Sequence, residues 1–234
     1  MTRRRRALVG VLMAIVSLLA AGYFSSWSTS PVEPQVSPTA TGSTGATVGL
    51  RTVPVRNSVP GYDRDCGLGH GCVFGPAWSD DVDVAGGHDG CDTRNQILHA
   101  AMSAVTTKHG TRGCVVLAGI LRDPYTGATI AFTKADAGQV AIDHIYPLAA
   151  AWDLGAWSWS SQQRRNFAND PRNLLPTARG VNASKGDKTP QGWAPPTAGG
   201  RCLYASRYAA VAAAYGLPVT ESDLRALRLD LSDC

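Results

Sequence analysis

The 234 residues of this chain are 44% hydrophobic and 17% charged, which is typical of a folded globular protein and argues against an intrinsically disordered chain. The formal net charge is +4, but residues 3–6 are four consecutive arginines. Without them the chain has 18 basic and 18 acidic residues, so overall charge gives no support for a polyanionic partner.

The first 24 residues have the pattern of an export signal. The four arginines are followed by an apolar stretch that ends near Phe24, as in the basic and hydrophobic parts of a signal peptide. This stretch is short for a membrane span, which needs about 20 apolar residues. We therefore favour cleavage over retention as an N-terminal membrane anchor. Both alternatives place the rest of the chain outside the cytoplasm, either secreted or tethered to the outer face of the membrane.

Residues 25–50 are rich in Ser, Thr, Pro, Gly and Ala and carry almost no charge. Such a composition cannot bury a hydrophobic core, so we predict a flexible linker. We expect one folded domain over residues 51–234, with no internal repeats.

Six cysteines follow the predicted signal, an even number that fits disulfides in an exported protein. Six cysteines allow 15 connectivities, so sequence alone does not fix the pairing. Proximity along the chain suggests three short-range pairs, each worth roughly 2–4 kcal/mol of stability. A zinc site is the alternative, but no Cys-x-x-Cys pair supports it. The suggested pairs are Cys66–Cys72, Cys91–Cys114 and Cys202–Cys234.

The domain is expected to be α+β, with a small antiparallel sheet and surrounding helices braced by disulfides. Residues 62–90 are rich in Gly, Asp and Cys and predict an irregular segment. Asp92 or Thr93 is a suitable N-cap for a helix that reaches Val105. The further elements predicted from apolar periodicity are strands at 114–121, 129–132 and 139–143, and helices at 147–159, 161–169, 201–215 and 221–229. Residues 172–188 are predicted as a loop with one short helix.

Chemistry-bearing residues gather around the strand at 139–143. Asp143 and His144 leave that strand, Asn173 lies in a later loop, and Asn182 precedes Lys185 by three residues in the short helix. A histidine of near-neutral pKa can take a proton from water. Asp143 and Asn182 offer the oxygen ligands that suit Mg²⁺ or Mn²⁺, and such a cation can polarise a phosphate. The pattern indicates metal-assisted phosphodiester hydrolysis.

These segments resemble the HNH endonucleases, and more closely the exported bacterial proteins related to the C-terminal domain of GmrSD-type restriction enzymes. The resemblance implies a ββα-metal fold with His144 as general base and Asp143 as the first metal ligand. It implies that Asn173 orients the base and that Asn182 is the second metal ligand, where Asn in place of His leaves the choice of metal open. The segments that carry the resemblance are 61–65, 90–95, 123–127, 143–148, 173–175 and 182–187.

Three basic residues are candidate substrate contacts: Lys185, Arg172 and Arg94. The stretch 164–188 has six basic and two acidic residues, so it is either a phosphate-binding surface or a solvated charged face. For Arg94 an ion pair with Asp92 or another carboxylate is the favoured alternative. A cluster of tryptophans could stack on bases, although core packing is the favoured explanation. The cluster comprises Trp152, Trp157 and Trp159.

The sequence thus predicts an exported, metal-dependent endonuclease that cuts DNA with little sequence specificity. An alternative is a non-catalytic nucleic-acid-binding module on the same scaffold, but the intact set of four motif residues argues against it. A hydrolase of another polymer is a third possibility, and the paired carboxylates that a glycosidase needs are not evident in the sequence.

Overall fold

The computed structural model describes residues 43–234, and the predicted export signal and most of the predicted linker lie outside the described residues. Within that described part, no helix is both long and apolar enough to cross a membrane. The short 3₁₀ helix η1 (Ser43–Thr47) lies where we expected linker. It contacts helices α5 and α6, and Thr47 is buried, so the last residues of the predicted linker belong to the fold.

A three-stranded antiparallel sheet contains β2 (Met102–Thr107), β3 (Val116–Arg122) and β4 (Thr129–Thr133), in that order. Helix α1 (Thr93–Ala101) begins at the predicted N-cap, where the Asp92 side chain accepts from the Asn95 backbone N–H. The helix ends earlier than predicted because Met102 pairs with Leu121. Strand pairing therefore overrides helical periodicity from residue 102 onward.

Strand β5 (Val140–His144) pairs with β6 (Leu174–Ala178) in a separate antiparallel pair, and α4 (Arg179–Lys185) follows β6 directly. Strand β6 lies in the segment that we predicted as loop. The strand was not predicted because it contains Pro176, and proline is rare in strands. Proline is tolerated at a sheet edge, and here it lies opposite Ile142 in a two-stranded sheet. The connection from β5 to β6 contains α2 (Leu148–Asp153), η3 (Ala156–Ser158), α3 (Ser161–Asn169) and η4 (Pro171–Asn173).

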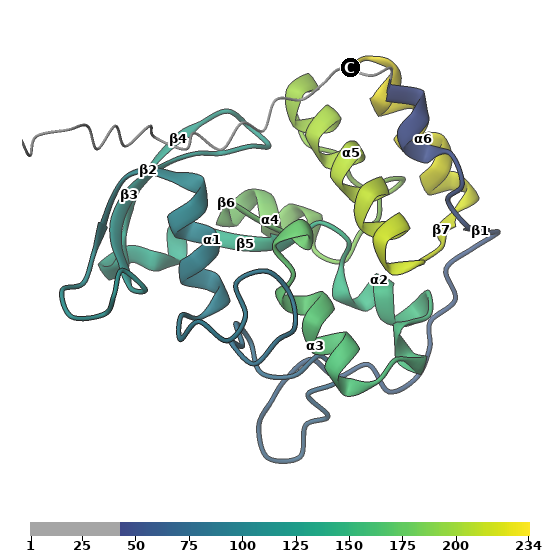
Figure 1. Ribbon diagram of the computed structural model, residues 1–234. Helices are drawn as coiled ribbons and strands as arrows, with labels where there is room; N and C mark the ends of the chain where they lie inside the picture. Colours follow the sequence, from purple (N-terminus) through teal and green to yellow (C-terminus); the bar gives the residue numbers. More distant parts are fainter. Residues whose placement is uncertain (1–42) are drawn as a thin grey trace, which may run out of the picture. The chain divides into compact units, whose positions relative to one another are not determined.

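Two long helices, α5 (Ala198–Tyr215) and α6 (Glu221–Ser232), complete the domain. A capping box starts α6, since Thr220 and Asp223 exchange side-chain-to-backbone hydrogen bonds there. β1 (Thr52–Val53) and β7 (Val219–Thr220) form a short parallel pair. In Figure 1 the β5–β6 pair and α4 lie between the three-stranded sheet with α1 and the α5 and α6 helices.

The mixed class of helices with small sheets is as predicted, although the strands divide into three sheets. All three suggested disulfides are present: Cys66–Cys72, Cys91–Cys114 and Cys202–Cys234. The first two brace the irregular segment before α1 and the start of β3. The third ties α5 to the C-terminal residue.

Candidate active site

His144 ends strand β5, and its ring is held in one protonation pattern. Its Nε2 lies 2.8 Å from the carbonyl oxygen of Ala168. A carbonyl only accepts, so Nε2 carries the proton and Nδ1 of the neutral ring keeps a free lone pair. Burial, together with the charges of Arg64 and Lys185, lowers the pKa of His144 to about 3. The ring is therefore neutral near pH 7, and the Nδ1 lone pair is unprotonated.

Asp143 is buried beside His144 and accepts two hydrogen bonds. The Lys185 ammonium donates to Oδ1 at 2.8 Å, and the Tyr125 hydroxyl donates to Oδ2 at 2.6 Å. Lys185 is fully buried and donates a second hydrogen bond, of 2.7 Å, to the carbonyl oxygen of His144. This corrects the expectation that Lys185 contacts phosphate, because its ammonium is enclosed beneath the strand end.

Asp143, His144 and Asn182 line one cavity of about 250 Å³. Asn182 reaches it from α4, since β6 returns antiparallel to β5 and brings the following helix against the end of β5. Arg64 and Asp187 line the same cavity. The structure therefore brings together the base and both metal ligands that the sequence suggested.

The oxygen donors of this cavity fit a hard divalent cation. A carboxylate has about four lone-pair positions, so Asp143 keeps acceptor capacity beyond its two hydrogen bonds. Lys185 offsets the Asp143 charge, whereas Asp187 adds a second carboxylate, which also pairs with Arg56 at 3.3 Å. Together with the Asn182 amide, these oxygens suit Mg²⁺ or Mn²⁺ better than a soft metal.

A second possible cation group lies nearby on the surface. Asp63, Asp65 and His70 place one ligand atom each within 4.8 Å of one another. Their contacts are those of a local turn, since Asp63 accepts from the backbone N–H groups of Asp65 and Gly71. This exposed group therefore does not compete with the cavity as a candidate site.

Asn173 is buried, and its side chain hydrogen-bonds to Tyr146 and not to the His144 ring. Its Oδ1 accepts from the Tyr146 backbone N–H at 2.8 Å, and its Nδ2 donates to the Tyr146 carbonyl at 3.2 Å. The backbone carbonyl of Asn173 accepts from Ile145 at 2.9 Å. Ala168 rather than Asn173 thus fixes the imidazole tautomer, and Asn173 clamps the backbone that follows the histidine.

The other predicted substrate contacts are engaged within the protein. Arg94 donates to the carbonyl oxygens of Ala137 and Val140, at 3.1 and 2.8 Å, so it joins α1 to the start of β5. These contacts favour a structural role for Arg94 over a substrate role, although its hydrogen bonds go to backbone carbonyls and not to the carboxylate that we expected. Arg172 pairs with the buried Asp170 at 2.6 Å, although its own side chain remains largely exposed.

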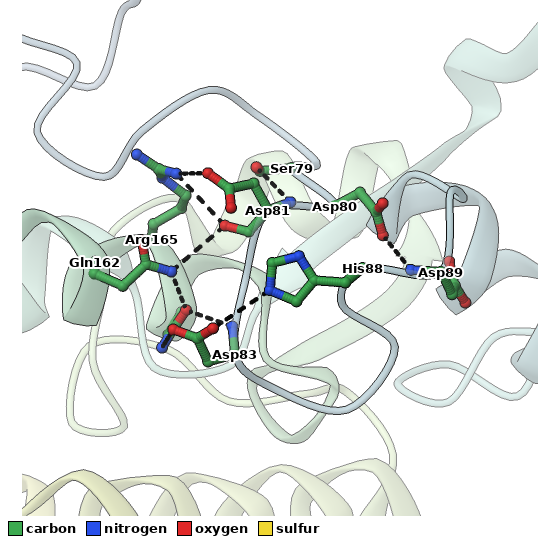
Figure 2. A network of polar contacts seen from close by, with 9 residues as sticks. Ser79, Asp80, Asp81, Asp83, His88, Asp89, Gln162 and Arg165 are labelled. Carbon is green, nitrogen blue, oxygen red and sulfur yellow. Dashed lines mark hydrogen bonds and ion pairs between the residues drawn. The ribbon is translucent and has the colours of Figure 1, made fainter.

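Two further arginines of the predicted basic face hold the irregular segment against α3. Arg164 donates to the Val73 carbonyl at 2.6 Å. Figure 2 shows Arg165 paired with Asp81, and Gln162 of the same helix contacting that segment. In the same view His88 contacts Asp83, at 3.3 Å. The stretch 164–188 is therefore in large part a structural support rather than a free phosphate-binding surface.

Arg64 lies at the cavity but was not among the basic residues that the sequence suggested as substrate contacts. It is exposed, lines the cavity beside His144, and has no hydrogen bond or ion pair from its guanidinium to any of residues 43–234. It precedes His144 by 80 residues, outside the local charge surplus. The signal that could have found it is its position within the 61–65 segment, one of those that carry the family resemblance.

Comparison with known proteins gives the family. The family described as GmrSD restriction endonucleases, C-terminal domain, matches residues 92–228, which include β5, β6 and α4. A protein of Arthroderma benhamiae described as an uncharacterized secreted protein is 37% identical over 146 residues, covering 62% of this chain and 68% of the relative. No solved structure matches. Since the family match covers more than half of its residues, this chain belongs to the GmrSD restriction endonuclease C-terminal domain family.

Proposed function

We propose that this chain is an exported, metal-dependent endonuclease of the HNH type that hydrolyses phosphodiester bonds of DNA with little sequence specificity. The observation that carries the proposal is the single cavity in which His144, Asp143 and Asn182 meet. The antiparallel β5–β6 pair followed by α4 supports an HNH-type core. Export is supported by the N-terminal sequence pattern and by the description of the fungal relative as secreted.

The proton transfer in this reaction belongs to His144. Its Nδ1 lone pair takes a proton from a water molecule, whose oxygen then attacks phosphorus while the bond to the 3′ oxygen breaks. The leaving oxygen acquires a proton from solvent. Ala168 keeps the ring oriented throughout, because Nε2–H remains bonded to its carbonyl. The guanidinium of Arg64, which has no partner among residues 43–234, is suited to hold a non-bridging phosphate oxygen.

Asp143 and Asn182 would hold the cation, with Asp187 as an additional oxygen donor at the same cavity. When bound, a hard divalent ion supplies positive charge to the phosphate and to the leaving oxygen. Lys185 is a positioning residue, because its two hydrogen bonds fix the Asp143 carboxylate and the His144 backbone.

The proposal is tested on supercoiled plasmid with the oxidised domain and a panel of divalent metals. We expect nicking with Mg²⁺ or Mn²⁺ that EDTA abolishes. His144→Ala is expected to lower the rate by about 10²–10⁴-fold. His99→Ala is the matched control, because His99 is an exposed histidine on α1 outside the cavity.

Plasmid binding without nicking, in every metal tested, would favour the alternative of a non-catalytic nucleic-acid-binding module. Equal nicking by wild type and His144→Ala would remove His144 as the base. Replacing the plasmid by RNA in the same assay tests the preference for DNA.

A further inference from the structure

A second cavity, of about 200 Å³, lies on another side of His144. We call it the Trp78 cavity. It shares Arg64, His144 and Leu148 with the cavity that holds Asp143 and Asn182. A group bound in the Trp78 cavity would therefore sit directly beside the phosphate on which His144 acts. The proposed reaction itself requires nothing in this second space.

The walls of the Trp78 cavity are largely apolar and aromatic. Phe74 and Trp78 contribute rings, and the Trp78 ring is nearly parallel to the His144 ring, with 9° between their planes and 6.1 Å between their centroids. Trp78 is only half-buried, and its backbone has a φ of 60°. A left-handed conformation is unfavourable for so bulky a residue, so the fold holds this ring beside His144 at a cost.

Asn169 gives the cavity one buried acceptor that lacks a donor. The residue is 1% exposed, and its Nδ2 donates to the Arg165 carbonyl at 3.0 Å. Because a carbonyl cannot donate, this bond fixes which end of the amide is nitrogen. The other end, Oδ1, has no hydrogen-bond partner among residues 43–234. Buried acceptors are nearly always satisfied, by protein groups or by ordered water, so Asn169 Oδ1 has the capacity to accept from an N–H group of a ligand.

Resting on the proposed nuclease function, we propose that the Trp78 cavity receives an unpaired nucleobase adjacent to the scissile phosphate. The base would stack on the indole of Trp78 and donate an N–H to Asn169 Oδ1. Cytosine, adenine and guanine carry exocyclic amino groups suited to this contact. In a duplex both faces of a base are covered by its neighbours in the stack, and base pairing uses one N–H of each amino group. The cavity therefore selects single-stranded DNA, or a nucleotide displaced from its stack.

The first test compares wild-type cleavage of a single-stranded oligonucleotide with cleavage of its duplex. We expect the single strand to be cut faster. Trp78→Ala should slow single-strand cleavage about 5- to 150-fold, the range for loss of one base–aromatic stack, and should affect duplex cleavage less. Trp157→Ala is the matched control, because Trp157 is 53% exposed and does not line this cavity. Trp78→Phe keeps an aromatic face and should recover part of the rate.

Binding gives a readout that does not depend on turnover. Deoxycytidine monophosphate should quench tryptophan fluorescence of the His144→Ala protein, whereas deoxyribose 5-phosphate, which has no base, should not. Asn169→Leu should weaken binding of the nucleotide and leave binding of the sugar phosphate unchanged. Trp78→Ala should remove the quenching.

The outcomes separate the two proposals. Wild type that cuts no nucleic acid in any metal contradicts the proposed function, whatever the nucleotide binding shows. Equal cleavage of single strand and duplex, with Trp78→Ala and Trp157→Ala indistinguishable, overturns the base pocket and leaves the nuclease intact. Equal fluorescence quenching by the nucleotide and the sugar phosphate also overturns the proposed base pocket.

Discussion

The buried pair of Lys185 and Asp143 allows a prediction with a calculable size. In Lys185→Met the side chain keeps its length and apolar character but loses its charge. Asp143 then remains 3% exposed with only the Tyr125 hydroxyl as donor, and the His144 carbonyl loses the 2.7 Å bond from the ammonium. Removing one partner of a buried ion pair typically costs about 3–5 kcal/mol. Lys185→Met is expected to lower the free energy of unfolding by this amount.

The measurement is urea unfolding of the oxidised protein, with Lys188→Met as the matched control. Lys188 is an exposed lysine just beyond α4, and its loss should change stability by less than about 0.5 kcal/mol. The double variant Lys185→Met with Asp143→Asn should cost less than the sum of the single changes, because no uncompensated charge stays buried. A Lys185→Met protein as stable as Lys188→Met, or strictly additive single changes, would refute the buried pair.

Two further predictions concern stability. The pKa of Asp170 lies below its usual value, because hydrogen bonds from Arg172 and Tyr215 outweigh the effect of burial, which alone would raise it. A carboxylate with a lowered pKa stabilises the fold above its unfolded-state pKa of about 3.9 and loses that contribution as the pH falls through its folded-state value. Asp170→Asn should therefore be less stable than wild type at pH 7, and the difference in urea midpoint should shrink below about pH 4; a constant difference would contradict this. The Cys202–Cys234 disulfide closes a loop with a sequence separation of 32 residues. Replacing both cysteines by serine should lower the free energy of unfolding by about 4 kcal/mol, from the loop entropy that the disulfide removes from the unfolded chain. Thermal unfolding measures this, and an unchanged melting temperature would contradict it.

Elements whose pattern is local were predictable. The N-cap at Asp92, the capping box of Thr220 with Asp223, and the return strand at β4 depend on residues a few positions apart. Strand β6 and the early end of α1 were missed because long-range pairing decides them. Met102 belongs to β2 because it pairs with Leu121 of β3. Pro176 belongs to β6 because it pairs with Ile142 of β5. Neither partner is visible in the local sequence.

The candidate site follows the same division. Asp143 and His144 were proposed because they are adjacent at a strand end. Asn182 was proposed because the sequence predicted it at the start of a short helix, and it lies in the middle of α4. Lys185 was predicted to contact the substrate, because its partner Asp143 lies 42 positions away and the sequence does not show the pairing. Trp78 was passed over in favour of three later tryptophans because nothing local shows that it faces His144. The residue types indicate the kind of chemistry that we propose, whereas the neighbours of each side chain could be found only from the fold.

Charge shows most clearly how the fold changes the meaning of a sequence count. Five of the six basic residues between 164 and 188 are bonded within the domain, to backbone carbonyls or to carboxylates, so the local surplus does not become an equally positive surface. They are Arg164, Arg165, Arg172, Lys185 and Lys188. Arg64, from a segment without a surplus, instead presents its charge at the cavity beside His144. A cation that is free to meet a phosphate is therefore identified by having no partner among the described residues and by its nearness to His144, and the density of basic residues along the chain predicts neither property.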